Sequence, residues 1–274
     1  AMFGEHRSAA NIERNRYRYT VGTLSFLGLE DGMTVMEIWP GGGWYTEILA
    51  PVIKDHGKFI VAGWDVDVPD QPGYRYNLNK AMLEKFAGAP EIYGDVGVVA
   101  FSPPQSASLG EPGSIDLLLT FRNTHGWINE GLAQDIFAEF GRVLKPGGVL
   151  LMTGPSITQI SRADMEQHGD HWRFTSVTLR RLFDESGGWT APEIRTYGNV
   201  YAATAFLHGL AVDVHRAGAA LGDAAAEFGS SEAQRVAQDP HQRGVGFDVD
   251  GMLLAIYGQL DWHGGSGQLK LRRR

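Results

Sequence analysis

The chain has 274 residues, which is enough for one large α/β domain with a core of its own. Its 24 Lys and Arg residues against 32 Asp and Glu residues give a net charge of −8, so the surface as a whole repels phosphate backbones and nucleic acid is not an expected partner. The absence of cysteine excludes disulfides and thiolate metal sites, and no apolar run approaches the roughly 20 residues that span a bilayer, so no membrane partner is expected.

Up to residue 155 the sequence alternates helical patterns with short apolar runs that are typical of strands buried on both faces. Five strands alternating with helices predict an α/β fold with a parallel sheet covered on both faces. In chain order the elements are a helix over 21–29 (VGTLSFLGL), a strand over 34–39 (TVMEIW), a helix over 44–53 (WYTEILAPVI), a strand over 57–65 (GKFIVAGWD), a helix over 77–88, a short strand over 91–96 (EIYGDV), a strand over 115–121 (IDLLLTF), a helix over 131–148 that runs into a turn, and a strand over 149–155 (VLLMTGP).

The remainder of the chain is less regular. Residues 176–188 (SVTLRRLFDESGG) predict a helix with Thr175 as its N-cap, and residues 192–199 (PEIRTYGN) predict a sixth strand. The apolar run 252–260 (MLLAIYGQL) is the expected last strand, and 263–268 (HGGSGQ) reads as a flexible linker to a basic tail.

The stretch Glu37 to Thr46, EIWPGGGWYT, lies between the first strand and a helix, where doubly wound sheets bind ligands. Glycines let the backbone approach a ligand closely, and the helix start offers unpaired N–H groups to an anion. A dinucleotide site requires G-x-G-x-x-G, but the third glycine position is Thr46. Glu37 would repel a pyrophosphate and suits an ammonium group. S-adenosylmethionine carries an ammonium, a carboxylate and a sulfonium, and therefore fits this stretch better.

Residues 35–51 (VMEIWPGGGWYTEILAP) resemble motif I of the class I S-adenosylmethionine-dependent methyltransferases. Together with 23–35 (TLSFLGLEDGMTV), 119–127 (LTFRNTHGW) and 142–150 (RVLKPGGVL), they are similar to an uncharacterised bacterial subgroup over about residues 14–155. Trp39 departs from the motif because it stands where its first glycine usually does. The segments 171–183 (HWRFTSVTLRRLF) and 197–211 (YGNVYAATAFLHGLA) resemble a different methyltransferase subgroup.

The resemblance implies a three-layer α/β sandwich with a mostly parallel, seven-stranded Rossmann-like sheet whose last strand is antiparallel. It implies one methyltransferase domain over residues 1–265, with an N-terminal helical extension (about 1–30) and a substrate-side elaboration (about 156–245), followed by a flexible basic tail (266–274). A cytoplasmic location is expected, although a signal peptide removed before this sequence begins would leave no trace in it. The sequence leaves a homodimer open.

The resemblance also implies how the cofactor would be held. Glu37 would pair with the methionine ammonium, and Asp65 would accept hydrogen bonds from both ribose hydroxyls, with Trp64 or Val66 along the adenine. Asp95 would recognise the adenine amino group, although it is equally typical of a turn. The expected cofactor-binding set is Glu37, Trp39, Gly41, Gly42, Gly43, Tyr45, Asp65, Asp95, Thr120, Arg122 and Asn123.

Residues after the fourth strand would face the transferred methyl group. Arg122 and His125 are the candidate catalytic residues, with His125 as general base, although a single loop histidine is more often structural. Residues 168–175 (HGDHWRFT) would form a substrate-side lid or simply begin a helix, and metal ligation is not expected there. The expected substrate-binding residues are Trp127, His171, Trp172 and Arg173.

The sequence therefore predicts a methyltransferase that moves a methyl group from S-adenosylmethionine to a small-molecule acceptor by in-line displacement, leaving S-adenosylhomocysteine. Two alternatives stay open at this point. One is a nicotinamide-dependent oxidoreductase, and the other is a non-catalytic protein that binds S-adenosylmethionine.

Overall fold

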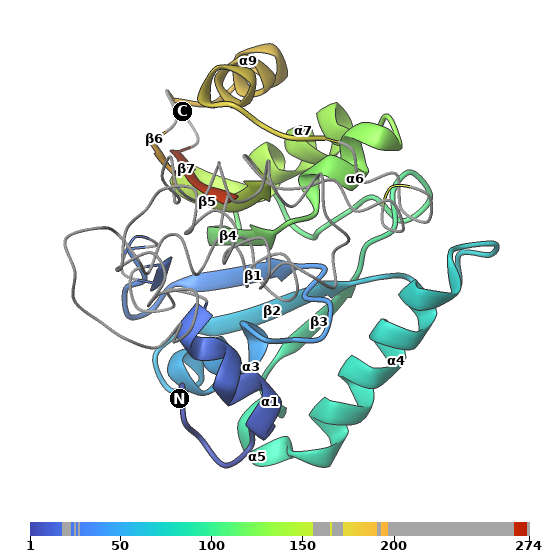
Figure 1. Ribbon diagram of the computed structural model, residues 1–274, viewed down its shortest axis with the longest axis vertical. Helices are drawn as coiled ribbons and strands as arrows, with labels where there is room; N and C mark the ends of the chain where they lie inside the picture. Colours follow the sequence, from blue (N-terminus) through green and yellow to red (C-terminus); the bar gives the residue numbers. More distant parts are fainter. Residues whose placement is uncertain are drawn as a thin grey trace, which may run out of the picture.

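The computed structural model describes residues 1–17, 23–24, 26, 28–155, 165, 172–190, 193–196 and 266–272. Figure 1 shows a central β-sheet with helices on both of its sides. The strands lie in the order β3-β2-β1-β4-β5-β7-β6. The helices are α1 (Ala9–Glu13), a 3₁₀ turn η1 (Arg14–Tyr17), α3 (Thr46–Ile53), α4 (Gly73–Gly88), α5 (Pro90–Tyr93), α6 (Thr124–Asn129), α7 (Ala133–Val143) and α9 (Ser176–Ser186).

Five strands form the parallel part of the sheet, as the sequence predicted. They are β1 (Thr34–Ile38), β2 (Lys58–Gly63), β3 (Gly97–Ala100), β4 (Ile115–Phe121) and β5 (Leu144–Pro155). The chain runs outward from β1 to β3 on one side and from β4 to β5 on the other. The strand order therefore reverses between β1 and β4, and the carboxyl ends of these two strands meet where such sheets bind ligands.

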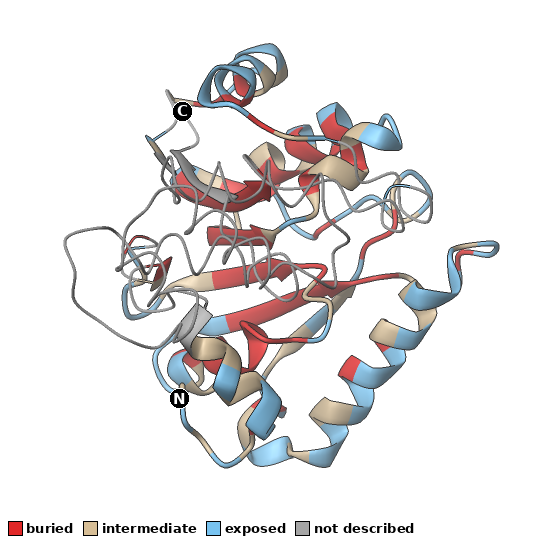
Figure 2. Ribbon diagram, viewed as in Figure 1, coloured by how far each residue is buried: buried red, intermediate tan, exposed pale blue. Residues whose placement is uncertain are grey.

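Apolar side chains of the strands alternate between two hydrophobic clusters, one on each face of the sheet. Met36 and Ile38 of β1 pack in the cluster that includes residues of α7 and α9, whereas Val35 packs in the cluster that includes residues of α3 and α5. Figure 2 shows that burial is concentrated along the strands, while α4 and α9 are largely exposed. This alternation places Glu37 on the same face as Val35, which is the face that α3 covers.

Two further strands extend the sheet beyond β5. β6 (Glu193–Thr196) and β7 (Ser266–Arg272) pair with each other in antiparallel orientation, and β7 pairs antiparallel with β5 along Val149–Pro155. β7 occupies residues 266–272, where we expected a flexible basic tail. Its sequence, SGQLKLR, alternates leucines with basic residues, a period of two that is typical of a strand. The run 252–260 lies outside the described residues.

The third strand was also misplaced by the sequence analysis. Residues 91–96 do not form a strand, because Pro90 begins the short helix α5 and a turn follows it. β3 instead starts at Gly97 with the β-branched pair Val98 and Val99. Among the described residues, no helix has the length and apolar character needed to cross a membrane.

Candidate functional site

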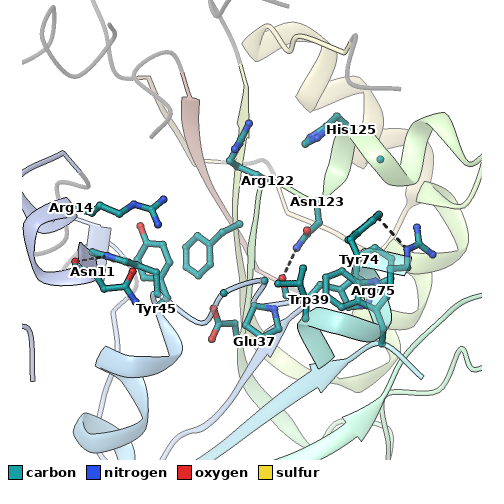
Figure 3. Close-up of a pocket in the computed structure, with 18 of the residues that line it drawn as sticks. Asn11, Arg14, Glu37, Trp39, Tyr45, Tyr74, Arg75, Arg122, Asn123 and His125 are labelled. Carbon is teal, nitrogen blue, oxygen red and sulfur yellow. Dashed lines mark hydrogen bonds between the residues drawn. The ribbon is translucent and has the colours of Figure 1, made fainter. Parts of the chain in front are cut away.

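A cavity of about 590 Å³ opens at the carboxyl ends of β1 and β4. Figure 3 shows Glu37 at its foot, with Arg122, Asn123 and His125 above it. Its walls come from the N-terminal segment, the turn after β1, the start of α4 and the segment after β4. The lining residues are Asn11, Arg14, Glu37, Trp39, Pro40, Gly41, Gly42, Trp44, Tyr45, Trp64, Tyr74, Arg75, Leu78, Phe121, Arg122, Asn123, His125, Gly126 and Glu130.

Two non-glycine residues with left-handed backbone conformations flank the cavity. Trp39 has φ 45° immediately after β1, and Arg122 has φ 65° immediately after β4. Asn123 connects the two turns, because its Nδ2 donates to Ile38 O at 3.1 Å and to Thr120 Oγ1 at 3.0 Å. Backbone strain of this kind persists only where the surrounding structure holds it, and it concentrates at functional sites.

The glycine turn presents open backbone to the cavity. Gly41 and Gly43 have φ values of 60° and 74°, a region that favours glycine, and Gly43 N donates to Pro40 O at 3.0 Å. A Cβ at Gly41 or Gly42 would meet nothing within 4 Å. The glycines at 41 and 43 are therefore required by the turn, and the turn leaves room for a ligand.

Glu37 is a buried carboxyl group that borders the cavity. Its residue surface is 1% exposed, and Thr46 Oγ1 donates a 2.6 Å hydrogen bond to its Oε2. Burial raises the pKa of Glu37 from 4.5 to about 7, and the hydrogen bond from Thr46 opposes this shift. Because water does not stabilise its charge, this group is suited to pairing with a cationic ligand group.

This raised pKa gives a testable dependence of stability on pH. Between pH 4.5 and about 7 the unfolded carboxyl is ionised while the folded one holds its proton, so the free energy of unfolding should fall as pH rises. The loss attributable to Glu37 should be roughly 3 kcal/mol across that interval. Urea unfolding of wild type and Glu37→Gln at pH 4.5 and 7.5 measures it. Parallel pH profiles for the two proteins would contradict the shift.

Trp39 separates the cavity from the core. Its ring stacks on Trp64 at a centroid distance of 5.4 Å and an interplanar angle of 24°, and its Nε1 donates to Phe101 O at 2.9 Å. Arg75 lies over the same ring at 5.5 Å and forms an ion pair with Glu130. The residue that replaces the motif's usual first glycine thus forms an aromatic wall.

The N-terminal segment closes another side of the cavity. Asn11 and Arg14 line it, and Trp44 Nε1 donates to Asn11 O at 2.9 Å. The segment is held by Glu47 of α3, whose carboxylate accepts hydrogen bonds from Arg7 at 3.2 Å and from Asn11 Nδ2 at 2.9 Å. Glu47 interrupts the apolar pattern of residues 44–53, and this is the signal in the sequence that could have indicated the attachment of the N-terminal segment to α3.

The structure brings together much of the predicted site. Trp64, rather than Val66, reaches the cavity, since Val66 is 50% exposed and does not line it. The predicted set did not include Asn11, Arg14, Trp44, Tyr74, Arg75 and Glu130, which also line the cavity. The predicted residues that line the cavity are Glu37, Trp39, Gly41, Gly42, Tyr45, Arg122, Asn123 and His125.

Asp65 and Asp95 do not line the cavity. Asp65 follows β2, but its Oδ1 accepts a hydrogen bond from Asp67 N at 3.0 Å, so its carboxylate shapes a turn. Asp95 precedes β3 and therefore lies at the amino end of the sheet, because the strand begins at Gly97 and not at Glu91 as predicted. The structure therefore does not bring Asp95 to the cavity, contrary to its expected position beside the adenine.

Other predicted residues also lie elsewhere. Gly43 is part of the turn but not of the lining, and Thr120 is fully buried beneath Asn123. Trp127 is fully buried, with its ring 5.5 Å from Phe140, so it is a core residue. Trp172 and Arg173 do not line the cavity, and His171 lies outside the described residues. Thr175 is the N-cap of α9, as predicted.

The fold is similar to solved methyltransferase structures. Phosphoethanolamine N-methyltransferase 2 of Haemonchus contortus, solved with phosphomonomethylethanolamine and S-adenosylhomocysteine, matches 93% of this chain at 14% identity with a TM-score of 0.52. This chain covers 52% of that protein, about half its length. Geranyl diphosphate C-methyltransferase of Streptomyces coelicolor A3(2), solved with Mg²⁺, geranyl diphosphate and S-adenosylhomocysteine, matches 100% of this chain, over 87% of its own length, at 12% identity with a TM-score of 0.54.

A candidate sarcosine dimethylglycine methyltransferase of Galdieria sulphuraria matches 95% of this chain, over 86% of its own length, at 17% identity with a TM-score of 0.52. No family model and no curated protein matches the sequence. At these identities the likeness is one of fold. The chain has the fold of the class I S-adenosylmethionine-dependent methyltransferases, as its motifs predicted.

Proposed function

We propose that this protein is an S-adenosylmethionine-dependent methyltransferase that acts on a small-molecule acceptor. The observation that carries the proposal is the pairing of a buried carboxyl, Glu37, with an open glycine turn at the point where the strand order reverses. An ammonium and a carboxylate on one carbon, as in the methionine part of the cofactor, complement these two features. The fold similarity supports the same class of ligand.

The residues of the cavity fit the methionine end of the cofactor best. Glu37 would hold the ammonium, and the backbone at Gly41 and Gly42 would face the carboxylate. Tyr45 and Trp44 line the same region with aromatic rings, and Tyr45 stacks on Phe121 at 3.7 Å. Ring faces attract a sulfonium by the same electrostatics that attract an ammonium. Trp39, Trp64 and Tyr74 supply an aromatic surface for the nucleoside.

The chemistry requires alignment more than acid or base groups. When bound, S-adenosylmethionine supplies a methyl group already activated by a positively charged sulfur. The chain's own residues would orient the acceptor in line, keep water out and remove a proton where the acceptor has one to lose. His125, which lines the cavity from α6, is the candidate for proton removal, and Arg122, which also lines the cavity, is the candidate for contacting the acceptor.

Replacing Glu37 by Gln tests the proposal directly. The amide keeps the size of the side chain and an acceptor for Thr46, but it cannot pair with an ammonium. Binding of S-adenosylhomocysteine, measured by calorimetry, should weaken by about 1.5–3 kcal/mol, or roughly 10- to 150-fold. Glu130→Gln is the matched control, because Glu130 lines the cavity while pairing with Arg75, and its effect should be smaller. Equal affinity of wild type and Glu37→Gln would rule out this role.

The same calorimeter separates the alternative functions. A nicotinamide-dependent oxidoreductase would bind NAD or NADP in preference to S-adenosylhomocysteine, and Glu37 argues against that outcome by repelling a pyrophosphate. A non-catalytic protein would bind S-adenosylmethionine without transferring its methyl group to any acceptor in a broad panel. The acceptor is proposed to be a small molecule because the N-terminal segment and α4 line the cavity beside the segment after β4 and leave a space of about 590 Å³.

We also infer that the β6 and β7 pairing completes the seven-stranded methyltransferase sheet with an antiparallel last strand. The antiparallel register of β7 with both β5 and β6 supports this inference. The bacterial subgroup, the domain limits, the homodimer and the cytoplasmic location stay predictions of the sequence.

A further inference from the structure

Three basic side chains border the cavity from three different elements. Arg14 comes from η1, Arg122 from the end of β4 and His125 from α6, and we call these residues the basic rim. Figure 3 shows all three above Glu37, with Arg122 between Arg14 and His125 in this view. The basic rim therefore lies on the side of the cavity away from Glu37.

Acidic and basic side chains are distributed unequally around the cavity. Its described acidic residues are Glu37 and Glu130, and Glu130 forms an ion pair with Arg75. Glu37 lies at the foot of the cavity, where the proposed function assigns it to the cofactor's ammonium. Arg14 and Arg122 of the basic rim add positive charge at the opposite side, in a chain whose net charge is −8. A local inversion of this kind concentrates anions at the mouth of a cavity.

The backbone at Arg122 gives a second, independent indication. A φ of 65° is unfavourable for arginine and is readily adopted by glycine or asparagine. Arg122 N donates to Thr153 O at 3.0 Å, and the adjacent Asn123 bonds to β1, so the strained conformation is fixed at both sides. The position carries a long guanidinium side chain at the cavity despite this backbone strain, which points to a function of the side chain.

We propose that the methyl acceptor carries an anionic group, a carboxylate or a phosphate, which Arg122 binds with the assistance of Arg14. The inference rests on the proposed methyltransferase function and names the acceptor's chemical class. A guanidinium offers a planar set of donors that matches two oxygens of either anion, and a lysine supplies only a point charge. The anion would fix the acceptor's orientation while its nucleophilic atom faces His125 and the cofactor.

The test uses the full chain saturated with S-adenosylhomocysteine, because this ligand has a carboxylate of its own, and saturation keeps that carboxylate from being counted as the acceptor's anion. Inorganic pyrophosphate and succinate are titrated separately by calorimetry, which distinguishes a phosphate from a carboxylate acceptor. Wild type should bind at least one probe, and Arg122→Asn should weaken that binding at least tenfold. Arg122→Lys should lie between them, and Arg14→Gln should weaken binding less than Arg122→Asn.

Arg122→Asn separates binding from folding, because asparagine tolerates the left-handed conformation. Its thermal unfolding midpoint should be no lower than that of wild type. Arg181→Asn is the control, since Arg181 is 79% exposed on α9 and does not line the cavity, and it should bind the probe as wild type does.

The possible results distinguish failure of the anionic-acceptor proposal from failure of the proposed methyltransferase function. If wild type binds S-adenosylhomocysteine but binds neither probe more tightly than Arg122→Asn does, the proposal of an anionic acceptor is overturned. Weaker S-adenosylhomocysteine binding by Arg122→Asn, without any anion binding by wild type, would assign Arg122 to the cofactor instead. Failure of wild type to bind S-adenosylhomocysteine would reject the proposed function, and this inference with it.

Discussion

Glu47→Gln should lower the free energy of unfolding by about 3–5 kcal/mol, because it leaves the guanidinium of Arg7 buried without its counter-charge. The Arg7 and Glu47 side chains are 0% and 3% exposed, and they are joined at 3.2 Å. Lys85 Nζ lies 2.7 Å from the same carboxylate. Arg7 and Lys85 thus share the carboxylate of Glu47 as their counter-charge. Glutamine has the same size as glutamate, so the variant retains the packing and removes only the charge. Urea unfolding monitored by tryptophan fluorescence measures the loss.

The comparison for Glu47 is Glu185→Gln on α9. Glu185 pairs with Arg181, and both side chains are well exposed, at 49% and 79%. Its replacement should change stability by less than about 0.5 kcal/mol. Glu47→Gln should also make the N-terminal segment sensitive to protease and weaken S-adenosylhomocysteine binding, because Asn11 and Arg14 would leave the cavity. Equal unfolding midpoints for wild type and Glu47→Gln would mean that solvent or other groups compensate Arg7.

His125→Ala should reduce methyl transfer by about 10²–10⁴-fold for an acceptor that must lose a proton, with cofactor affinity unchanged. The histidine lines the cavity on α6, on the side of the cavity away from Glu37. Its removal takes away a proton acceptor without altering the groups proposed to bind the cofactor. Transfer of labelled methyl from S-adenosylmethionine to an acceptor panel, with calorimetry of S-adenosylhomocysteine in parallel, measures both quantities.

His56→Ala provides the matched control for His125. His56 is 61% exposed, lies near Asp31 and does not line the cavity, so turnover should remain at the wild-type rate. If His125→Ala also retains full turnover, the histidine has a scaffold role. An acceptor that needs no deprotonation would show the same result, so the panel should include both kinds of acceptor.

Local sequence patterns were sufficient for most of the parallel sheet. β1, β2, β4 and β5 are runs of apolar and β-branched residues long enough to be recognised without a partner strand. β3 is only four residues long and half exposed, so its pattern was too weak to place correctly. The alternating pattern of β7 covers only Leu269 to Arg272 and follows a glycine-rich stretch, so it was too short to be predicted as a strand, and the pairing with β5 extends over all seven residues.

The residues of the candidate site also differ in how far the local sequence predicted them. Some site residues lie next to strand ends in the sequence, namely Glu37, the glycines after β1 and the residues after β4. Their positions relative to the strands alone predicted that they would lie close together at one edge of the sheet. Asp65 could not be judged in this way. It follows β2 as expected, but it does not line the cavity, and its carboxylate accepts a local hydrogen bond from Asp67 N. Arg14, Tyr74 and Arg75 come from segments whose sequences carry no signal of the cavity. Tyr74 and Arg75 are brought there by their contacts with Trp64 and Trp39, and Arg14 by the attachment of the N-terminal segment to Trp44 and Glu47.

The sequence by itself determined the class of fold, the ligand-binding edge of the sheet and the pairing of an acid with a glycine turn, because each depends on residues near one another along the chain. The tertiary structure decided that Trp39 is a wall, that Glu37 is buried enough to raise its pKa to about 7, and that a basic rim faces it across the cavity. Burial and electric field are summed over all neighbours in space, and those neighbours are set by the fold.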